Sequence, residues 1–185
     1  VARYLRGCTP DPDYSNSYGE TRGWRGPNQG INVWKKWFPE HYGHVDPEVL
    51  TGEAREDMRL TIAHLQRIFD APFLNKWQVN SARIIPLATV FPEALFIRMK
   101  RDPAFMAQSI LIGKRELFPD QSNWFSVKPA SYEQLKEKEG IEQICYQIYH
   151  LEQEMDRDAH IVGKDRFMEM AYEDLCDSVH RAMER

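Results

Sequence analysis

The sequence predicts an α/β domain in which a parallel sheet is flanked by helices. The first observation is a short, nearly all-apolar run from Ala94 to Met99, which is typical of a strand buried on both faces. The second is a later predicted strand from Arg166 to Tyr172, with segments of helical periodicity between the two. This strand–helix–strand order predicts parallel pairing within one domain.

The composition is that of an ordinary globular protein. The chain has 185 residues, of which 42% are hydrophobic and 28% charged, enough for one domain with a sizeable core. The net charge of −4, without a block of Lys and Arg, argues against non-specific nucleic-acid binding. No apolar run has the length of a membrane span, and the first residues lack the pattern of a signal peptide.

The cysteines favour a reducing compartment. Cys8, Cys145 and Cys176 are far apart and odd in number, and their spacing indicates neither a metal site nor a disulfide framework. We therefore expect a cytoplasmic protein with no membrane partner.

The N-terminal region, Val1 to Pro47, is irregular and rich in aromatic residues. Its segment GWRGPNQG has no apolar strand before it and no Gly-Lys-Ser/Thr after it. It fails the context test for a phosphate-binding P-loop, and we predict a turn-rich loop. A short amphipathic helix is predicted next, from the helical spacing of Ile31, Trp34, Trp37 and Phe38.

Two helices are predicted before the central strand. Thr51 can cap the first, which ends at Asp70-Ala71-Pro72. A second short strand follows at Phe73 and Leu74 and leads to Lys76.

The second of these helices is predicted to begin at Asn80 or Ser81. Because Pro86 is tolerated only in a first turn, its regular part is expected to start near Arg83.

The corner after the central strand carries the clearest local signals. Asp102 has the preferred N-cap chemistry and Pro103 occupies the preferred first position, so a helix is predicted over Ala104 to Lys114. Arg101 is thereby placed at the carboxyl end of a strand, where open α/β sheets bind ligands. It also lies beside a helix N-terminus, which favours anions.

A long helix is predicted after the loop Phe118 to Pro129. Ser131 and Gln134 form a capping box for it, and Gly140 is a potential break. Its apolar stripe, assigned to the core, comprises Leu135, Ile141, Ile144, Ile148, Leu151 and Met155. A last helix is predicted to bury Leu175, Val179 and Met183.

The order of these motifs resembles that of sulfotransferases that use 3'-phosphoadenosine 5'-phosphosulfate (PAPS), most closely their bacterial-type small-molecule branch. The motifs, which span Phe73 to Leu175, are Lys76, Asn80-Ser81-x-Arg83-Ile84, FPEA, Arg101-Asp102-Pro103, Ser109, WFSVKP and YEDL. The resemblance implies the P-loop NTPase-like sulfotransferase fold. It also implies PAPS as co-substrate, a small-molecule hydroxyl or amine acceptor, and no metal requirement.

The resemblance assigns roles to four residues. Arg101 and Ser109 would hold the 3'-phosphate. The planar guanidinium of Arg101 can bind a phosphate with two hydrogen bonds. Ser109 lies six residues beyond Pro103, roughly 9 Å along the helix, within reach of a long Arg side chain. Tyr172 of YEDL would lie near the adenine, although a Tyr that ends a buried strand fits equally well.

Lys76 would stabilise charge on the oxygen that bridges phosphate and sulfate, and the alternative for it is a surface lysine. A general base is also required. Glu20, His41 and His44 are open candidates, because they lie in the aromatic N-terminal region.

One feature of the family pattern is missing from the sequence. The family binds the 5'-phosphosulfate with a Gly-rich loop containing Arg-x-Gly-Thr, and no such segment occurs in residues 1–185. We therefore expect a single sulfotransferase-like domain over 1–185 that is incomplete at its N-terminus. A non-catalytic nucleotide-binding or interaction module is the alternative function. A P-loop kinase is disfavoured because Lys-Ser/Thr is lacking.

Overall fold

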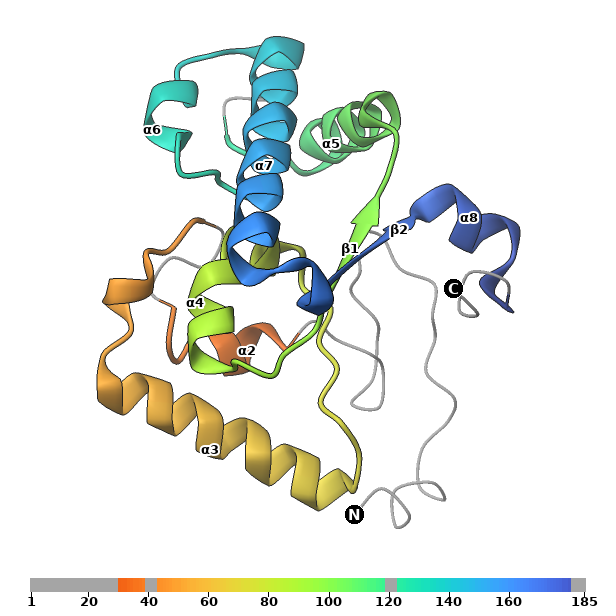
Figure 1. Ribbon diagram of the computed structural model, residues 1–185. Coiled ribbons are helices and arrows are strands. Elements are labelled where there is room, and N and C mark those ends of the chain that lie inside the picture. Colours follow the sequence, from red (N-terminus) through yellow and green to blue (C-terminus); the bar gives the residue numbers. More distant parts are fainter. Residues whose placement is uncertain (1–29, 39–42, 119–122, 181–185) are drawn as a thin grey trace, which may run out of the picture.

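A computed structural model describes residues 30–38, 43–118 and 123–180 of the chain. Figure 1 shows a two-stranded sheet with α7 standing beside it, α5 near the upper end of α7 and α3 along the base. The elements, in chain order, are α2 (Ile31–Trp34), η1 (Pro47–Val49), α3 (Gly52–Phe69), η2 (Gln78–Ala82), α4 (Ile84–Val90), β1 (Phe96–Lys100), α5 (Pro103–Leu117), α6 (Tyr132–Leu135), α7 (Gly140–Val162), η3 (Lys164–Arg166), β2 (Phe167–Ala171) and α8 (Tyr172–Asp177).

The sheet confirms the predicted α/β class. Strands β1 and β2 pair in parallel, with a register that runs from Phe96 opposite Phe167 to Lys100 opposite Ala171. Helices α5, α6 and α7 connect them, as a parallel crossover requires. Because the pairing is parallel and in register, the carboxyl ends of both strands lie at the same edge of the sheet.

The burial predicted for β1 is wrong. Its buried residue is Arg98, whereas Ile97 and Met99 are 55% and 41% exposed. Side chains alternate along a strand, so Ile97 and Met99 lie on the face opposite Arg98, while the half-buried Phe96 shares the Arg98 face. On the neighbouring strand Met168, which pairs with Ile97, is exposed as well. Within the described residues, the sheet is covered on the Arg98 face.

Helix α5 begins as its sequence predicts. The Asp102 carboxylate accepts a hydrogen bond from the Ala104 amide at 2.7 Å, and Pro103 occupies the first turn. The helix continues through Gly113 to Leu117, three residues beyond the predicted Lys114, and packs on α7. The cap therefore fixes the direction in which the chain leaves the end of β1.

The hydrophobic core lies between the N-terminal helices and the α4 region. Trp34 and Trp37 stand edge to face, with ring centroids 6.0 Å apart. The Thr51 hydroxyl caps α3 by accepting from the Ala54 amide. The buried members of this core are Trp34, Trp37, Phe38, Val45, Leu50, Met58, Trp77, Val79, Ala82, Leu87, Val90 and Val127.

Several other predicted boundaries differ. Phe73 and Leu74 form no strand; Leu74 is 86% exposed and the segment runs irregularly up to Lys76. The helix after it is regular only from Ile84, as Pro86 predicts. The last helix, α8, stops at Asp177, and Val179 is exposed. Met183, Cys8 and the GWRGPNQG glycines Gly23 and Gly26 lie outside the described residues.

The capping box predicted at Ser131 is wrong. No partner binds the Ser131 hydroxyl within the described residues, and α6 ends after one turn at Leu135. Gly140 has a φ of +56°, a left-handed conformation that suits glycine, and it begins the separate helix α7. The helix predicted after Pro129 is therefore two helices, and the potential break at Gly140 is confirmed.

Glu154 on α7 is a buried carboxyl group, 7% exposed. Its Oε1 accepts a hydrogen bond from the Ala130 amide at 2.8 Å, while its Oε2 has no partner among the described residues. Loss of hydration raises the pKa of Glu154 above its ordinary 4.5, and the Ala130 bond and the charge of His44 oppose this only in part. The folded protein therefore holds this proton more tightly than the unfolded chain.

This burial predicts a pH-dependent stability. Below pH 4.5 the carboxyl is protonated in both states. As pH rises from there through the raised folded-state pKa, only the unfolded chain readily ionises, so the free energy of unfolding falls. Glu154→Gln should remove that decline. Urea unfolding at several pH values between about 4 and 8 tests this. The control is Glu56→Gln on the exposed face of α3, and equal pH profiles for the two variants would contradict the assignment.

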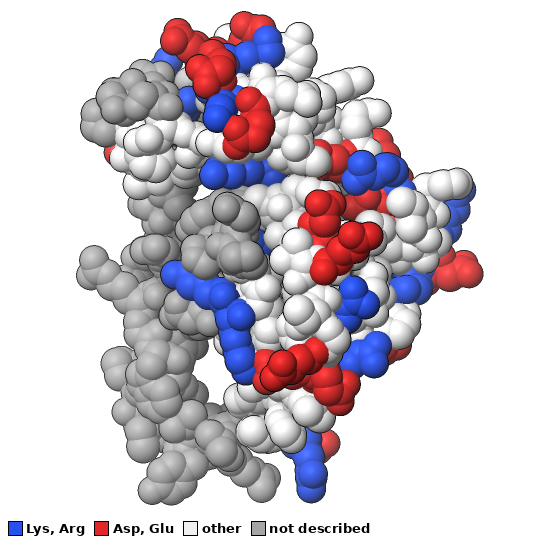
Figure 2. All heavy atoms as spheres, turned by 90° about the vertical axis from the view of Figure 1, so that its left-hand side faces the viewer, with Lys and Arg blue, Asp and Glu red and all other residues white. Residues whose placement is uncertain are grey.

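Figure 2 shows one face of the molecule, on which Lys and Arg alternate with Asp and Glu among uncharged residues. No continuous field of one sign covers this face. No helix in the described part of the chain is long and apolar enough to cross a membrane.

Candidate functional site

The carboxyl edge of the sheet brings Arg101 and Tyr172 together. Arg101 is the first residue after β1, and Tyr172 is the first after β2. The guanidinium carbon of Arg101 lies 5.0 Å from the centroid of the Tyr172 ring, which is a cation–π contact. The parallel register causes this meeting, because residues that follow paired strand ends emerge side by side.

Both ends of this corner are tied by acidic side chains. The Asp102 carboxylate accepts a hydrogen bond from the Ala104 amide, and Glu173 Oε1 accepts one from the Asp102 amide at 3.3 Å. Two carboxylates of the protein therefore occupy amides at the N-terminus of α5. These two amides are therefore not open to the ligand anion that the sequence predicts at this helix end.

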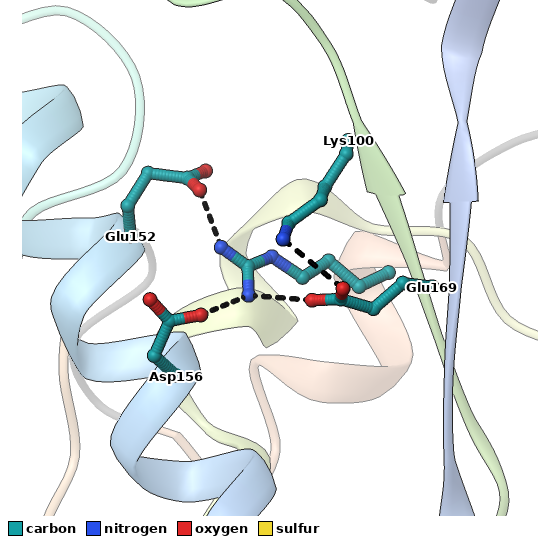
Figure 3. A network of polar contacts seen from close by, with 5 residues as sticks. Lys100, Glu152, Asp156 and Glu169 are labelled. Atoms are coloured by element: carbon teal, nitrogen blue, oxygen red, sulfur yellow. Dashed lines mark hydrogen bonds and ion pairs between the residues drawn. The ribbon is translucent and has the colours of Figure 1, made fainter.

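Next to the corner lies an ion-pair network that is centred on one buried arginine and drawn in Figure 3. The side chain of Arg98 on β1 is only 4% exposed and reaches three carboxylates. It pairs with Glu152 and, at 2.5 Å, with Asp156, both on α7. It also reaches Glu169 on β2, at 3.0 Å. Burial lowers the pKa of Arg98, but the bonds to Asp156 and Glu152 outweigh it and raise that pKa.

Two arginines three positions apart therefore have opposite surroundings. Arg98 is enclosed by carboxylates, whereas no hydrogen bond or ion pair to a carboxylate engages Arg101 within the described residues. Arg101 is half-buried, and its guanidinium carries five N–H donors. A fork of this kind over an aromatic ring matches the bidentate geometry of a phosphate.

Tyr172 is a neutral partner for a ligand. Its ring is 40% exposed, so it does not end a buried strand; that alternative is wrong. The pKa of its phenol is raised, chiefly by a hydrogen bond with the Cys176 side chain one turn later on α8, while Arg101 acts in the opposite direction. The phenol stays protonated at physiological pH, and Tyr172 is partly exposed beside Arg101.

Ser109 and Lys76 are not joined to this pair by any contact among the described residues. Ser109 is exposed on α5, seven residues after the cap Asp102, and so about two helical turns along the same side. Lys76 is exposed in the irregular segment before η2, not at the end of a strand beside β1. The strand neighbouring β1 is β2.

Of the three candidate bases, only His44 lies in the described part of the chain. Its Nε2 is 3.3 Å from Asp46 Oδ1, and a backbone bond ties the His44 amide to Lys128. Glu20 and His41 lie outside the described residues. A search of the described residues finds no group of three or more His, Cys, Asp and Glu side chains suited to a metal ion. Cys145 and Cys176 are free thiols.

Sequence reasoning missed the Arg98 network and the contact of Glu173. A signal was present in each case. Arg98 interrupts an apolar strand, and a charge inside a strand is buried only when paired. Glu152 and Asp156 are four residues apart in EQEMD, which places both on one helix face. The sequence does not show that Glu169 on β2 joins the groups on β1 and α7.

Comparison with known proteins identifies the family of the chain. A family model described as the sulfotransferase family matches residues 10–185. No curated protein and no solved structure gave a significant match. The matched span includes β1, the Arg101 corner, α5 and the β2–Tyr172 segment. Since it covers nearly the whole sequence, this chain belongs to the sulfotransferase family.

Proposed function

We propose that this protein binds PAPS at the carboxyl edge of the sheet and transfers its sulfuryl group to a hydroxyl or amine of a small-molecule acceptor. Family membership supports sulfuryl transfer as the reaction class. The observation that carries the choice of donor is Arg101. It is an arginine with no carboxylate partner among the described residues, placed 5.0 Å from an exposed aromatic ring.

The two side chains suit different parts of the donor. The Arg101 guanidinium offers paired donors to the 3'-phosphate, and Ser109 can add a hydroxyl from the next turns of α5. The exposed face of Tyr172 suits stacking on the adenine. A guanidinium and an aromatic ring at one corner therefore suit a nucleotide that carries an additional phosphate on its ribose.

The transfer breaks the bond between sulfur and the oxygen that bridges it to the 5'-phosphate. A new bond forms between that sulfur and the acceptor oxygen or nitrogen, and the acceptor proton passes to a base. The bridging oxygen leaves with the negative charge on 3',5'-adenosine bisphosphate. We assign stabilisation of this charge to Lys76, the residue to which the family resemblance gives this role, and its side chain is exposed on an irregular segment.

Arg101→Ala should weaken binding of 3',5'-adenosine bisphosphate far more than binding of adenosine 5'-phosphate. A charge-assisted bond contributes roughly 1.5–3 kcal/mol, which corresponds to a loss of about ten- to a hundred-fold. Calorimetric titration of both nucleotides on the full-length protein measures this. Arg67→Ala at the exposed end of α3 is the control. Equal losses for the two nucleotides would show that Arg101 does not act on the 3'-phosphate.

Ser109→Ala should show the same pattern with a smaller loss. A neutral hydroxyl bond contributes about 1 kcal/mol, or about five-fold in affinity. Because Ser109 is exposed on α5, the free energy of unfolding should change little. The same titrations test this, and an unchanged affinity for the bisphosphate would remove Ser109 from the site.

Lys76→Ala in the full-length protein should lower turnover and leave the affinity for 3',5'-adenosine bisphosphate nearly unchanged. The reason is that charge on the bridging oxygen develops only in the transition state. A donor-dependent transfer assay is the measurement, with the exposed Lys164→Ala as control. Unaltered turnover would show that Lys76 is not the electrophilic group. Nucleotide binding without transfer in the wild type would favour a non-catalytic module.

A further inference from the structure

Two adjacent cations end β1, and the fold separates them. Lys100 is the last residue of the strand and Arg101 the first after it. Lys100 lies on the same face as Arg98, two residues earlier, because strand side chains alternate. Arg101 turns instead to the ring of Tyr172. A flexible ammonium beside the corner would attract any nearby phosphate, since it lacks the directional fork of a guanidinium.

Glu169 holds Lys100 on that face. Its Oε2 lies 3.0 Å from Lys100 Nζ, while its other oxygen, Oε1, lies 3.0 Å from Arg98 Nη1. Figure 3 shows the carboxylate bridging the two cations, with Lys100 directed toward the network. An isolated surface pair would contribute little and would hold Lys100 loosely.

This pair is anchored from behind. Arg98, which fixes the orientation of Glu169, is itself buried and bound to Glu152 and Asp156 on α7. Glu169 also lies opposite Arg98 in the strand register. The position of Lys100 is therefore set by the packing of β1, β2 and α7 together.

We propose that Glu169 is a specificity-determining positioning residue: it neutralises and holds Lys100, so that Arg101 is the cation that meets the ligand at this corner. The inference rests on the proposed nucleotide site and adds how that site selects nucleotides that carry a 3'-phosphate. Discrimination in favour of a 3'-phosphate requires a single directional cation at the corner. A second, freed cation there would bind phosphates of any nucleotide.

The test is the ratio of the affinities for 3',5'-adenosine bisphosphate and adenosine 5'-phosphate. Glu169→Gln removes the charge that holds Lys100, and the ratio should fall about five-fold, because adenosine 5'-phosphate gains a phosphate contact at the corner that the bisphosphate already has from Arg101. That gain should shrink at high salt, as it does for an exposed charge contact. Lys100→Met alone should leave the ratio unchanged, because Lys100 is already neutralised. Lys100→Met added to Glu169→Gln should restore the wild-type ratio.

Glu152→Gln is the matched control. It too removes one of the three carboxylates around Arg98, but Glu152 has no contact with Lys100. The affinity ratio of the Glu152→Gln variant should equal that of the wild type. This comparison separates the structural effect of weakening the network from the effect of releasing Lys100. Equal ratios for Glu169→Gln and Glu152→Gln, or no restoration by Lys100→Met, would overturn the inference. A wild type without an Arg101-dependent preference for the bisphosphate would instead show that the proposed function fails.

Discussion

The buried guanidinium of Arg98 is the interaction on which the sheet edge depends. An ion this deeply buried loses several kcal/mol of hydration, and only close, well-oriented partners offset that loss. Its three carboxylates come from α7 and from β2, so they can surround it only when both elements are in place. The network thus selects one arrangement of strand, strand and helix. An apolar side chain at this position would pack against either neighbour without fixing their relation.

That arrangement also distributes charge along the edge. Before the corner, Glu169 forms ion pairs with Arg98 and Lys100. After the corner, Glu173 accepts a hydrogen bond from the Asp102 amide. Between these contacts Arg101 meets only the ring of Tyr172 within the described residues. Carboxylates therefore lie on both sides of Arg101 at this edge of the sheet. Such a site relies on directional contact more than on a broad positive field, in keeping with a net charge of −4.

The position of Lys76 has a different physical basis. Its segment was predicted to contain a strand, yet Leu74 and Lys76 are exposed and unpaired in the sheet. An irregular segment holds a side chain less firmly than a strand end does. Its fixed neighbour is Trp77, which is buried in the aromatic core. The core therefore fixes the residue that follows Lys76, while the Lys76 side chain itself is exposed.

Local chemistry in the sequence determined the parts of the fold that depend on few neighbours. Four features could be predicted because each rests on propensity, capping or alternation within a short segment. They are the helix caps at Asp102-Pro103 and Thr51, the strand near residues 96–100, and the parallel crossover. The position of Arg101 at a strand end followed directly. The break at Gly140 was also indicated, because glycine suits the left-handed conformation found there. The irregular course of Phe73 and Leu74 was not, since two apolar residues favour a strand only weakly.

The tertiary structure alone decided which charges meet. Nothing local to FIRMKRD says that Arg98 faces inward, that Lys100 is neutralised, or that Arg101 is left open. Those outcomes depend on residues more than fifty positions away, Glu152, Asp156 and Glu169. The physical reason is that a salt bridge is a property of a pair in space. The sequence determined which residues could bind a phosphate, and the packing of β1, β2 and α7 decided which one is available to do so.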